Sequence, residues 1–174
     1  MTKPDLGERE GRSPEERYRG ARNNLLLLIV FTAINLLMPL LGIDRQYFFS
    51  ASFPTTVYWL GDAVAADLGM PALRYGALMI ALGCVGLYLL CWLLAKKRRG
   101  FMTAALVLFG LDCLSLAGEF VIFELHYSMI INVLFHLWVL WGLIQGVRAS
   151  MELKKLETAQ MIFVPGEEET PAQE

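Results

Sequence analysis

Four long apolar stretches constrain the fold of this chain more than any other feature. Three of them have charge-free cores, and the third in chain order contains only Asp112 and Glu119. Each is close to the roughly 20 residues that an α-helix needs to cross the ~30 Å hydrocarbon core of a bilayer. We therefore expect an all-α integral membrane protein, a four-helix bundle. The expected spans lie at about 24–43, 73–95, 101–123 and 127–147.

The distribution of Lys and Arg predicts how the bundle is oriented. Basic residues concentrate in the polar arm 1–22, in the turn "KKRR" at 96–99, and in the polar helix and acidic tail at 148–174. Only Arg45 and Arg74 flank the connection between spans 1 and 2. By the positive-inside rule, both termini are expected in the cytoplasm. In the sequence, they flank an expected transmembrane domain at 23–147.

The connection between spans 1 and 2 predicts a short helix. Apolar residues recur at helical spacing, with Thr55 or Thr56 as the expected N-cap. We expect an amphipathic helix lying flat in the outer interface, either as a lid over a cavity or as an anchor without a ligand. The spaced apolar residues are Val57, Leu60, Val64 and Leu68, and the candidate lid residues are Tyr47, Phe48, Tyr58 and Trp59.

The stretch "LDCLSLAGEF" at 111–120 places carboxylates inside span 3. Asp112, Ser115 and Glu119 share one helical face, since they stand at i, i+3 and i+7. A charged residue at mid-bilayer costs about 2.5–3.5 kcal/mol, so this face is expected to turn inward. At ~1.5 Å of rise per residue, side chains of spans 1 and 4 reach matching depths. The predicted pocket residues are Asn35, Asp112, Ser115, Glu119, Asn132 and His136.

Three hypotheses for these polar residues remain open. They hydrogen-bond between helices, with Asp112 neutral or paired with a charged His136, and so fix the packing. Alternatively, they bind a small ligand, a cation or a proton in an outward-facing pocket. Metal-assisted or acid–base catalysis is the third hypothesis, although no H-E-x-x-H spacing supports it. We predict no catalytic residue and no cofactor, leave any metal unknown, and consider an enzyme the less favoured class.

The composition of the chain limits the classes of binding partner that we expect. The net charge is −2, and the basic residues follow from membrane topology, so nucleic acid is not expected. Three cysteines without a C-x-x-C pair indicate neither a disulfide framework nor a redox motif. The expected partners are the lipid bilayer and either a second copy or another membrane protein, because a four-helix unit has little interior volume for a conduit.

Two segments carry a resemblance. The stretches "RNNLLLLIVFTAINLL" with "YFFSASFP", and "IINVLFHLWVLWGLIQGVRA" with "LKKL", resemble small four-span membrane proteins of bacteria that have no assigned activity. The resemblance implies a bacterial cytoplasmic membrane, and its motifs include Asn35 and His136. The leading functional hypothesis is a bacterial inner-membrane transporter, sensor or accessory subunit with an intramembrane pocket, and the alternative is a structural or assembly protein.

Overall fold

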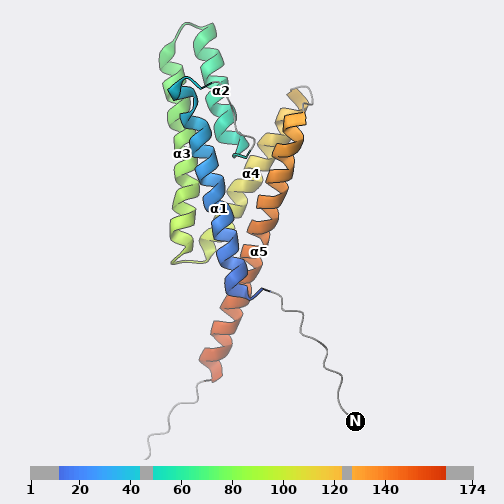
Figure 1. Ribbon diagram of the computed structural model, residues 1–174. Helices are drawn as coiled ribbons and strands as arrows, with labels where there is room; N and C mark the ends of the chain where they lie inside the picture. Colours follow the sequence, from blue (N-terminus) through green and yellow to red (C-terminus); the bar gives the residue numbers. More distant parts are fainter. Residues whose placement is uncertain (1–11, 44–48, 123–126, 164–174) are drawn as a thin grey trace, which may run out of the picture.

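The computed structural model describes residues 12–43, 49–122 and 127–163, and these residues form an all-helical protein. The helices follow one another along a bundle that narrows to a single helix at one end (Figure 1). They are α1 (Pro14–Leu37), the short 3₁₀ helix η1 (Pro39–Leu41), α2 (Ser52–Asp67), α3 (Pro71–Ala95), α4 (Gly100–Ile122) and α5 (Tyr127–Phe163).

Four helices among the described residues are long and apolar enough to cross a membrane. Their outer faces carry large apolar side chains such as Ile80, Leu111 and Leu114, which are all more than half exposed. Such a surface would not be stable in water, and it supports a multi-pass membrane protein. The candidate spans are Pro14–Leu41, Pro71–Ala95, Gly100–Phe120 and Ile130–Gln160.

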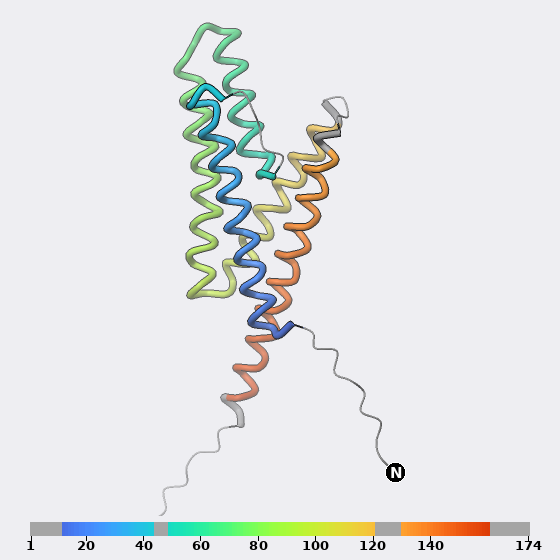
Figure 2. The backbone as a smooth tube through the Cα atoms, viewed as in Figure 1, coloured from blue at the N-terminus to red at the C-terminus, as the bar shows by residue number. Residues whose placement is uncertain are grey.

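Helices α1 and α5 pack closely along much of their length. A Cβ atom at Gly146 would collide with Ala21, and one at Gly142 would collide with the side chain of Asn24. The two glycines therefore allow the backbones to approach, as small residues do between membrane helices. Helix α5 continues past the bundle (Figure 2), where Glu152 pairs with Arg17 of α1.

Helix α2 forms an antiparallel hairpin with α3. The turn between them contains Gly69 at φ 63°, a left-handed conformation that favours glycine. Arg74 of α3 pairs with Asp62 at 3.0 Å and donates to the Tyr58 hydroxyl at 3.1 Å. Gly61 lies directly against Ala77, where a Cβ atom would not fit.

The structure differs in two ways from what the sequence predicted for α2. The predicted helix is present, but it runs alongside α3 (Figure 1) rather than flat across the helix ends. The predicted N-caps are also wrong, because α2 begins at Ser52 and Thr55 is already inside its first turn. The Thr55 hydroxyl donates to the Ala51 carbonyl at 2.9 Å. The residue that caps α2 is instead Asp112 of α4, which is far from Ser52 in the sequence.

Gly61→Ala tests the α2–α3 packing. We expect it to lower the free energy of unfolding by about 1–3 kcal/mol, because the added methyl overpacks the contact with Ala77. Gly76→Ala on α3 is the matched control, since its Cβ would meet nothing within 4 Å. In this control, replacing a helical glycine by alanine should raise the free energy of unfolding by roughly 0.5–1 kcal/mol. Thermal unfolding of both purified proteins in detergent is the measurement, and two variants of equal stability would contradict the close approach.

Candidate functional site

The start of α2 lies inside the helix bundle. Ser50, Ala51 and Ser52 are 7%, 0% and 2% exposed, although they sit where a chain segment enters a helix. The first N–H groups of any helix have no partner within that helix. Because a buried N–H without an acceptor is costly, side chains of the surrounding helices must supply acceptors here.

Asp112 of α4 caps α2. The Ser52 N–H donates to its Oδ2 at 3.0 Å, and the Phe53 N–H donates to its Oδ1 at 2.8 Å. A carboxylate is favoured at this position because the N-terminus of a helix carries a partial positive charge. Asp112 is 1% exposed. The carboxylate inside this apolar span therefore has a defined structural partner, which is the N-terminus of α2.

His136 of α5 completes the arrangement around Asp112. Its Nε2 lies 2.9 Å from Oδ2 of Asp112, and its Nδ1 lies 2.8 Å from the carbonyl oxygen of Asn132. A carbonyl only accepts, so Nδ1 carries a hydrogen. Because Asp112 also accepts from two backbone N–H groups, the geometry fits a carboxylate paired with an imidazolium. The pair is then neutral overall and shares one proton between Nε2 and Oδ2.

Aromatic rings fix the orientation of the imidazole. The ring of Phe109 stacks on His136 with centroids 5.3 Å apart and an interplanar angle of 17°. Phe135 meets the same imidazole edge-on at 6.0 Å. His136 is 2% exposed, and both of its ring nitrogens lie within hydrogen-bonding distance of protein atoms.

Helix α1 and Asn132 hold the residues at and just before the start of α2. The Ala51 N–H donates to Oγ1 of Thr32 at 2.9 Å, and Asn35 donates to the Ser50 hydroxyl at 2.7 Å. From α5, Asn132 donates to the Ser52 hydroxyl at 3.3 Å. Three helices therefore fasten one buried segment. We call this set the α2 anchor; it comprises Thr32, Asn35, Ser50, Ala51, Ser52, Phe53, Asp112, Asn132 and His136.

The predicted pocket residues do not all meet at one point. Asn35, Asp112, Asn132 and His136 gather around the segment at Ser52, each bonding to that segment or to a neighbour within the α2 anchor. Glu119 lies further along α4 and accepts from the Thr56 hydroxyl of α2. Ser115 lies apart from the anchor and lines a neighbouring groove, described below.

The predicted lid residues divide between described and undescribed parts of the chain. Tyr58 is 1% exposed and belongs to the α2–α3 contact, where its hydroxyl accepts from Arg74. Trp59 packs edge-on against Tyr58, with ring centroids 5.6 Å apart. Tyr47 and Phe48 lie outside the described residues.

The sequence did not predict three members of the α2 anchor, Thr32 on α1 and Ser50 and Ser52 at the start of α2. Thr32 is three residues before Asn35 and shares its helical face, which is the only signal in the sequence for its role. Ser50 and Ser52 stand just before Phe53 and Pro54, where no helical periodicity marks them as buried.

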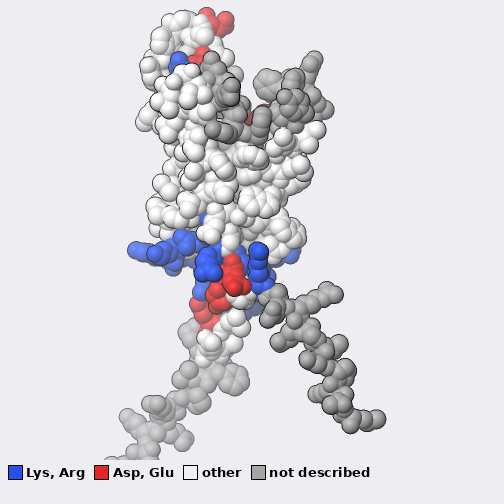
Figure 3. All heavy atoms as spheres, viewed as in Figure 1, with Lys and Arg blue, Asp and Glu red and all other residues white. Residues whose placement is uncertain are grey.

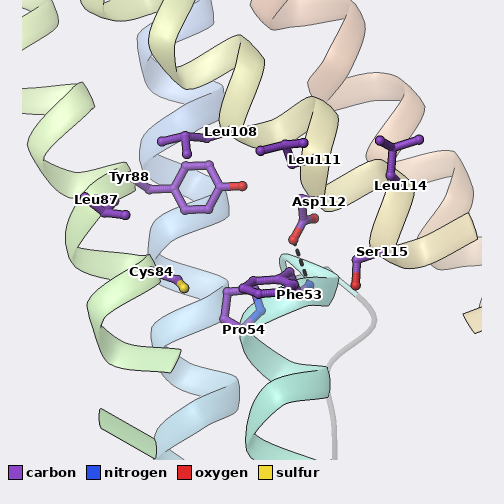
Figure 4. A pocket seen from close by; sticks show the side chains of 10 residues that line it. All are labelled: Phe53, Pro54, Cys84, Leu87, Tyr88, Leu108, Leu111, Asp112, Leu114 and Ser115. Carbon is purple, nitrogen blue, oxygen red and sulfur yellow. Dashed lines mark hydrogen bonds between the residues drawn. The ribbon is translucent and has the colours of Figure 1, made fainter. Parts of the chain in front are cut away.

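A groove with a volume of about 600 Å³ lies next to the α2 anchor, and Asp112 forms part of its wall (Figure 4). Tyr88 reaches into it from α3 toward Leu111 and Asp112 of α4. Its walls are almost entirely apolar, and the exposed Leu111 and Leu114 place its opening on the side of the bundle. The lining residues are Phe53, Pro54, Cys84, Leu87, Tyr88, Leu108, Leu111, Asp112, Leu114 and Ser115.

Within the described ranges 12–43, 49–122 and 127–163, no group of three His, Cys, Asp or Glu side chains could hold a metal ion. Asp112 and His136 meet as a pair, and Glu119 bonds to Thr56 instead. The arrangement thus consists of one Asp112–His136 pair, one helix N-terminus and one apolar groove, and the Asp112 carboxylate is common to all three.

Asp112→Asn tests the α2 anchor. An amide offers one acceptor oxygen where the carboxylate offers two, so one N–H of α2 or His136 loses its partner. We expect the free energy of unfolding to fall by about 3 kcal/mol. Ser115→Ala, one turn further along the same face, is the control and should change stability by less than about 1 kcal/mol. Chemical unfolding in detergent measures both, and equal stability of the two variants would rule out the capping role of Asp112.

No protein-family model, curated protein or solved structure matches the chain.

Proposed function

We propose that the chain is an integral membrane protein of the bacterial cytoplasmic membrane with both termini in the cytoplasm. The support is the charge pattern: the start of α1, the turn at 96–99 and the far half of α5 lie at the same end of the bundle (Figure 1), and Lys and Arg side chains gather there (Figure 3). Arg74 is the described basic residue at the opposite end. An excess of basic residues on one side marks the cytoplasmic side of a membrane protein.

We further propose that the protein binds a small, mostly apolar molecule in the groove beside Asp112. The groove itself is the observation that carries this proposal, because about 600 Å³ is within the usual range of small-molecule sites. Its opening on the side of the bundle would face lipid, so the ligand would enter from the bilayer. This proposal places the ligand in an apolar groove with a single carboxylate in its wall, whereas the sequence-based hypothesis places it among the polar residues.

A binding role as a sensor or an accessory subunit fits this geometry better than a conduit. The middle of the bundle is filled by fully buried side chains, including Leu28, Phe109 and Val139. The described residues that line the groove come from α2, α3 and α4, and none of them belongs to α1 or α5. Coupling to transport would need a second copy or another membrane protein.

A structural role is the second candidate, and a specific observation favours it. The polar side chains of the α2 anchor bond to one another and to the segment at Ser52, which is how buried polar groups specify a packing arrangement. The two candidates differ in the groove rather than in the anchor. Only the binding role requires the groove to be occupied.

Cysteine accessibility in intact cells tests the topology. In a variant with serine at the three native cysteine positions, we expect Asp67→Cys to react with a membrane-impermeant maleimide. Lys97→Cys, at the opposite end of α3, should react only after the cells are opened. Both positions are exposed, so burial does not bias the comparison. Labelling of Lys97→Cys alone in intact cells would reverse the proposed orientation.

A groove-filling substitution tests ligand binding. Leu111→Trp places an indole in the groove, while Val107→Trp places one on the same helix outside the groove lining; both wild-type side chains are 59% exposed. We expect organic extracts of the purified wild-type protein and of Val107→Trp to contain the same co-purified molecule. Mass spectrometry should find it at least about fivefold depleted in Leu111→Trp. Equal amounts in all three proteins would favour the structural role.

A further inference from the structure

We infer that the ligand of the groove is a lipophilic cation, and that its binding expels the proton shared by Asp112 and His136. This inference rests on the proposed ligand-binding role and adds the chemical class of the ligand and the ion exchanged for it. Its basis is the chemistry of the groove wall and the charge state of the buried pair.

The wall chemistry favours a cation. Among the lining residues the groove has aromatic rings from Phe53 and Tyr88, one carboxylate from Asp112, and no Lys or Arg. Aromatic faces attract cations, most strongly where water is excluded. His136 pairs with Asp112 from α5 and is not among the lining residues, so the carboxylate is the only charged group that the groove wall presents. An anion of the same size would meet a like charge there, and a neutral molecule would gain at most a hydrogen bond. Size and apolarity select a lipophilic ligand, and charge selects a cationic one.

Asp112 has acceptor capacity left for such a ligand. An ionised carboxylate has about four lone-pair positions. Among the hydrogen bonds of the described residues, Oδ2 accepts from Ser52 and His136, whereas Oδ1 accepts from Phe53. Asp112 also belongs to the groove lining. A cation in the groove would act on this carboxylate by its charge, and it need not displace the N–H groups that α2 donates.

Charge balance then requires a proton to leave. With the cation bound, the imidazolium of His136 and the ligand would be two positive charges against one buried carboxylate, which is costly at low dielectric constant. Loss of the Nε2 proton to solvent restores neutrality: one cation enters and one proton leaves. Nδ1 keeps its hydrogen and its bond to the Asn132 carbonyl. The Ser52 hydroxyl, 3.5 Å from Nε2, can turn to donate to the freed nitrogen.

Other titratable groups surround the pair and must be considered as proton sources. In the described part of the chain, those in electrostatic reach of Asp112 are Cys84 and Tyr88 on α3, and Cys113 and Glu119 on α4. Helices α1 and α2 present the neutral side chains of Thr32, Asn35 and Ser52. Glu119 is the closest competitor, since it also lies in electrostatic reach of His136.

Two probes of matched shape and opposite charge provide the test. Tetraphenylphosphonium and tetraphenylborate are titrated into the full-length protein in lipid nanodiscs, with binding heats measured in buffers of different ionisation enthalpy. We expect tetraphenylphosphonium to bind at least about tenfold more tightly than tetraphenylborate and to release about one proton. Its affinity should rise by up to about tenfold per pH unit while the pair holds its proton. Leu111→Trp should weaken binding at least about tenfold, and Val107→Trp should not.

Two variants identify the proton source. Asp112→Asn should lose both the proton release and its pH dependence, because the carboxylate that shares the proton is gone. Glu119→Gln should release the same proton as the wild type. If proton release disappears in Glu119→Gln and persists in Asp112→Asn, the assignment to the Asp112–His136 pair is wrong.

The failure of the inference differs from the failure of the proposed function. If both probes bind equally well and both lose affinity in Leu111→Trp, the groove is a binding site without a preference for cations, and the inference falls alone. If tetraphenylphosphonium binds the wild type without releasing a proton, the exchange is also refuted. If neither probe responds to Leu111→Trp, the groove is not the site, and the inference falls together with its premise.

Discussion

The rest of the structure depends on how the first N–H groups of α2 are satisfied inside an apolar bundle. In hydrocarbon, each unpaired backbone group costs several kcal/mol, so a helix cannot begin at this depth without acceptors. Asp112 provides both acceptors, and His136 lies 2.9 Å from the same carboxylate, so that Asp112 is not an isolated buried group. Because these residues come from α4 and α5, the start of α2 fixes the relative positions of all three helices.

The groove follows from the same constraint. With Ser52 held by Asp112, the next two residues, Phe53 and Pro54, form a wall against α3 and α4. The carboxylate serves packing on one side and faces the groove on the other. Packing and binding are thus properties of one residue rather than exclusive alternatives, which is why substitutions in the groove wall, at Leu111, separate them better than substitutions at Asp112.

The sequence predicted the features that depend on bilayer thickness and helical geometry. Four apolar helices follow from the length needed to cross hydrocarbon, and the pairing of Asp112 with His136 follows from matching depths in neighbouring spans. The buried start of α2 was not predictable, because its bonds join residues about 60 and 80 positions apart. Thr55 and Thr56 look like caps locally, yet a carboxylate from α4 caps the helix. Periodicity likewise places the apolar face of α2 but not the helix that covers it.

Cross-linking in native membranes tests most directly whether α2 begins inside the bundle. In a cysteine-free variant, thiols are introduced by Ser52→Cys and Asn132→Cys, whose wild-type side chains hydrogen-bond at 3.3 Å. A bifunctional thiol reagent with a span of only a few ångströms should join them within one chain. Ser52→Cys combined with Leu134→Cys, which lies on the exposed face of α5, should not be joined. No cross-link in the first pair, or equal cross-linking in both, would contradict a start of α2 held between α4 and α5.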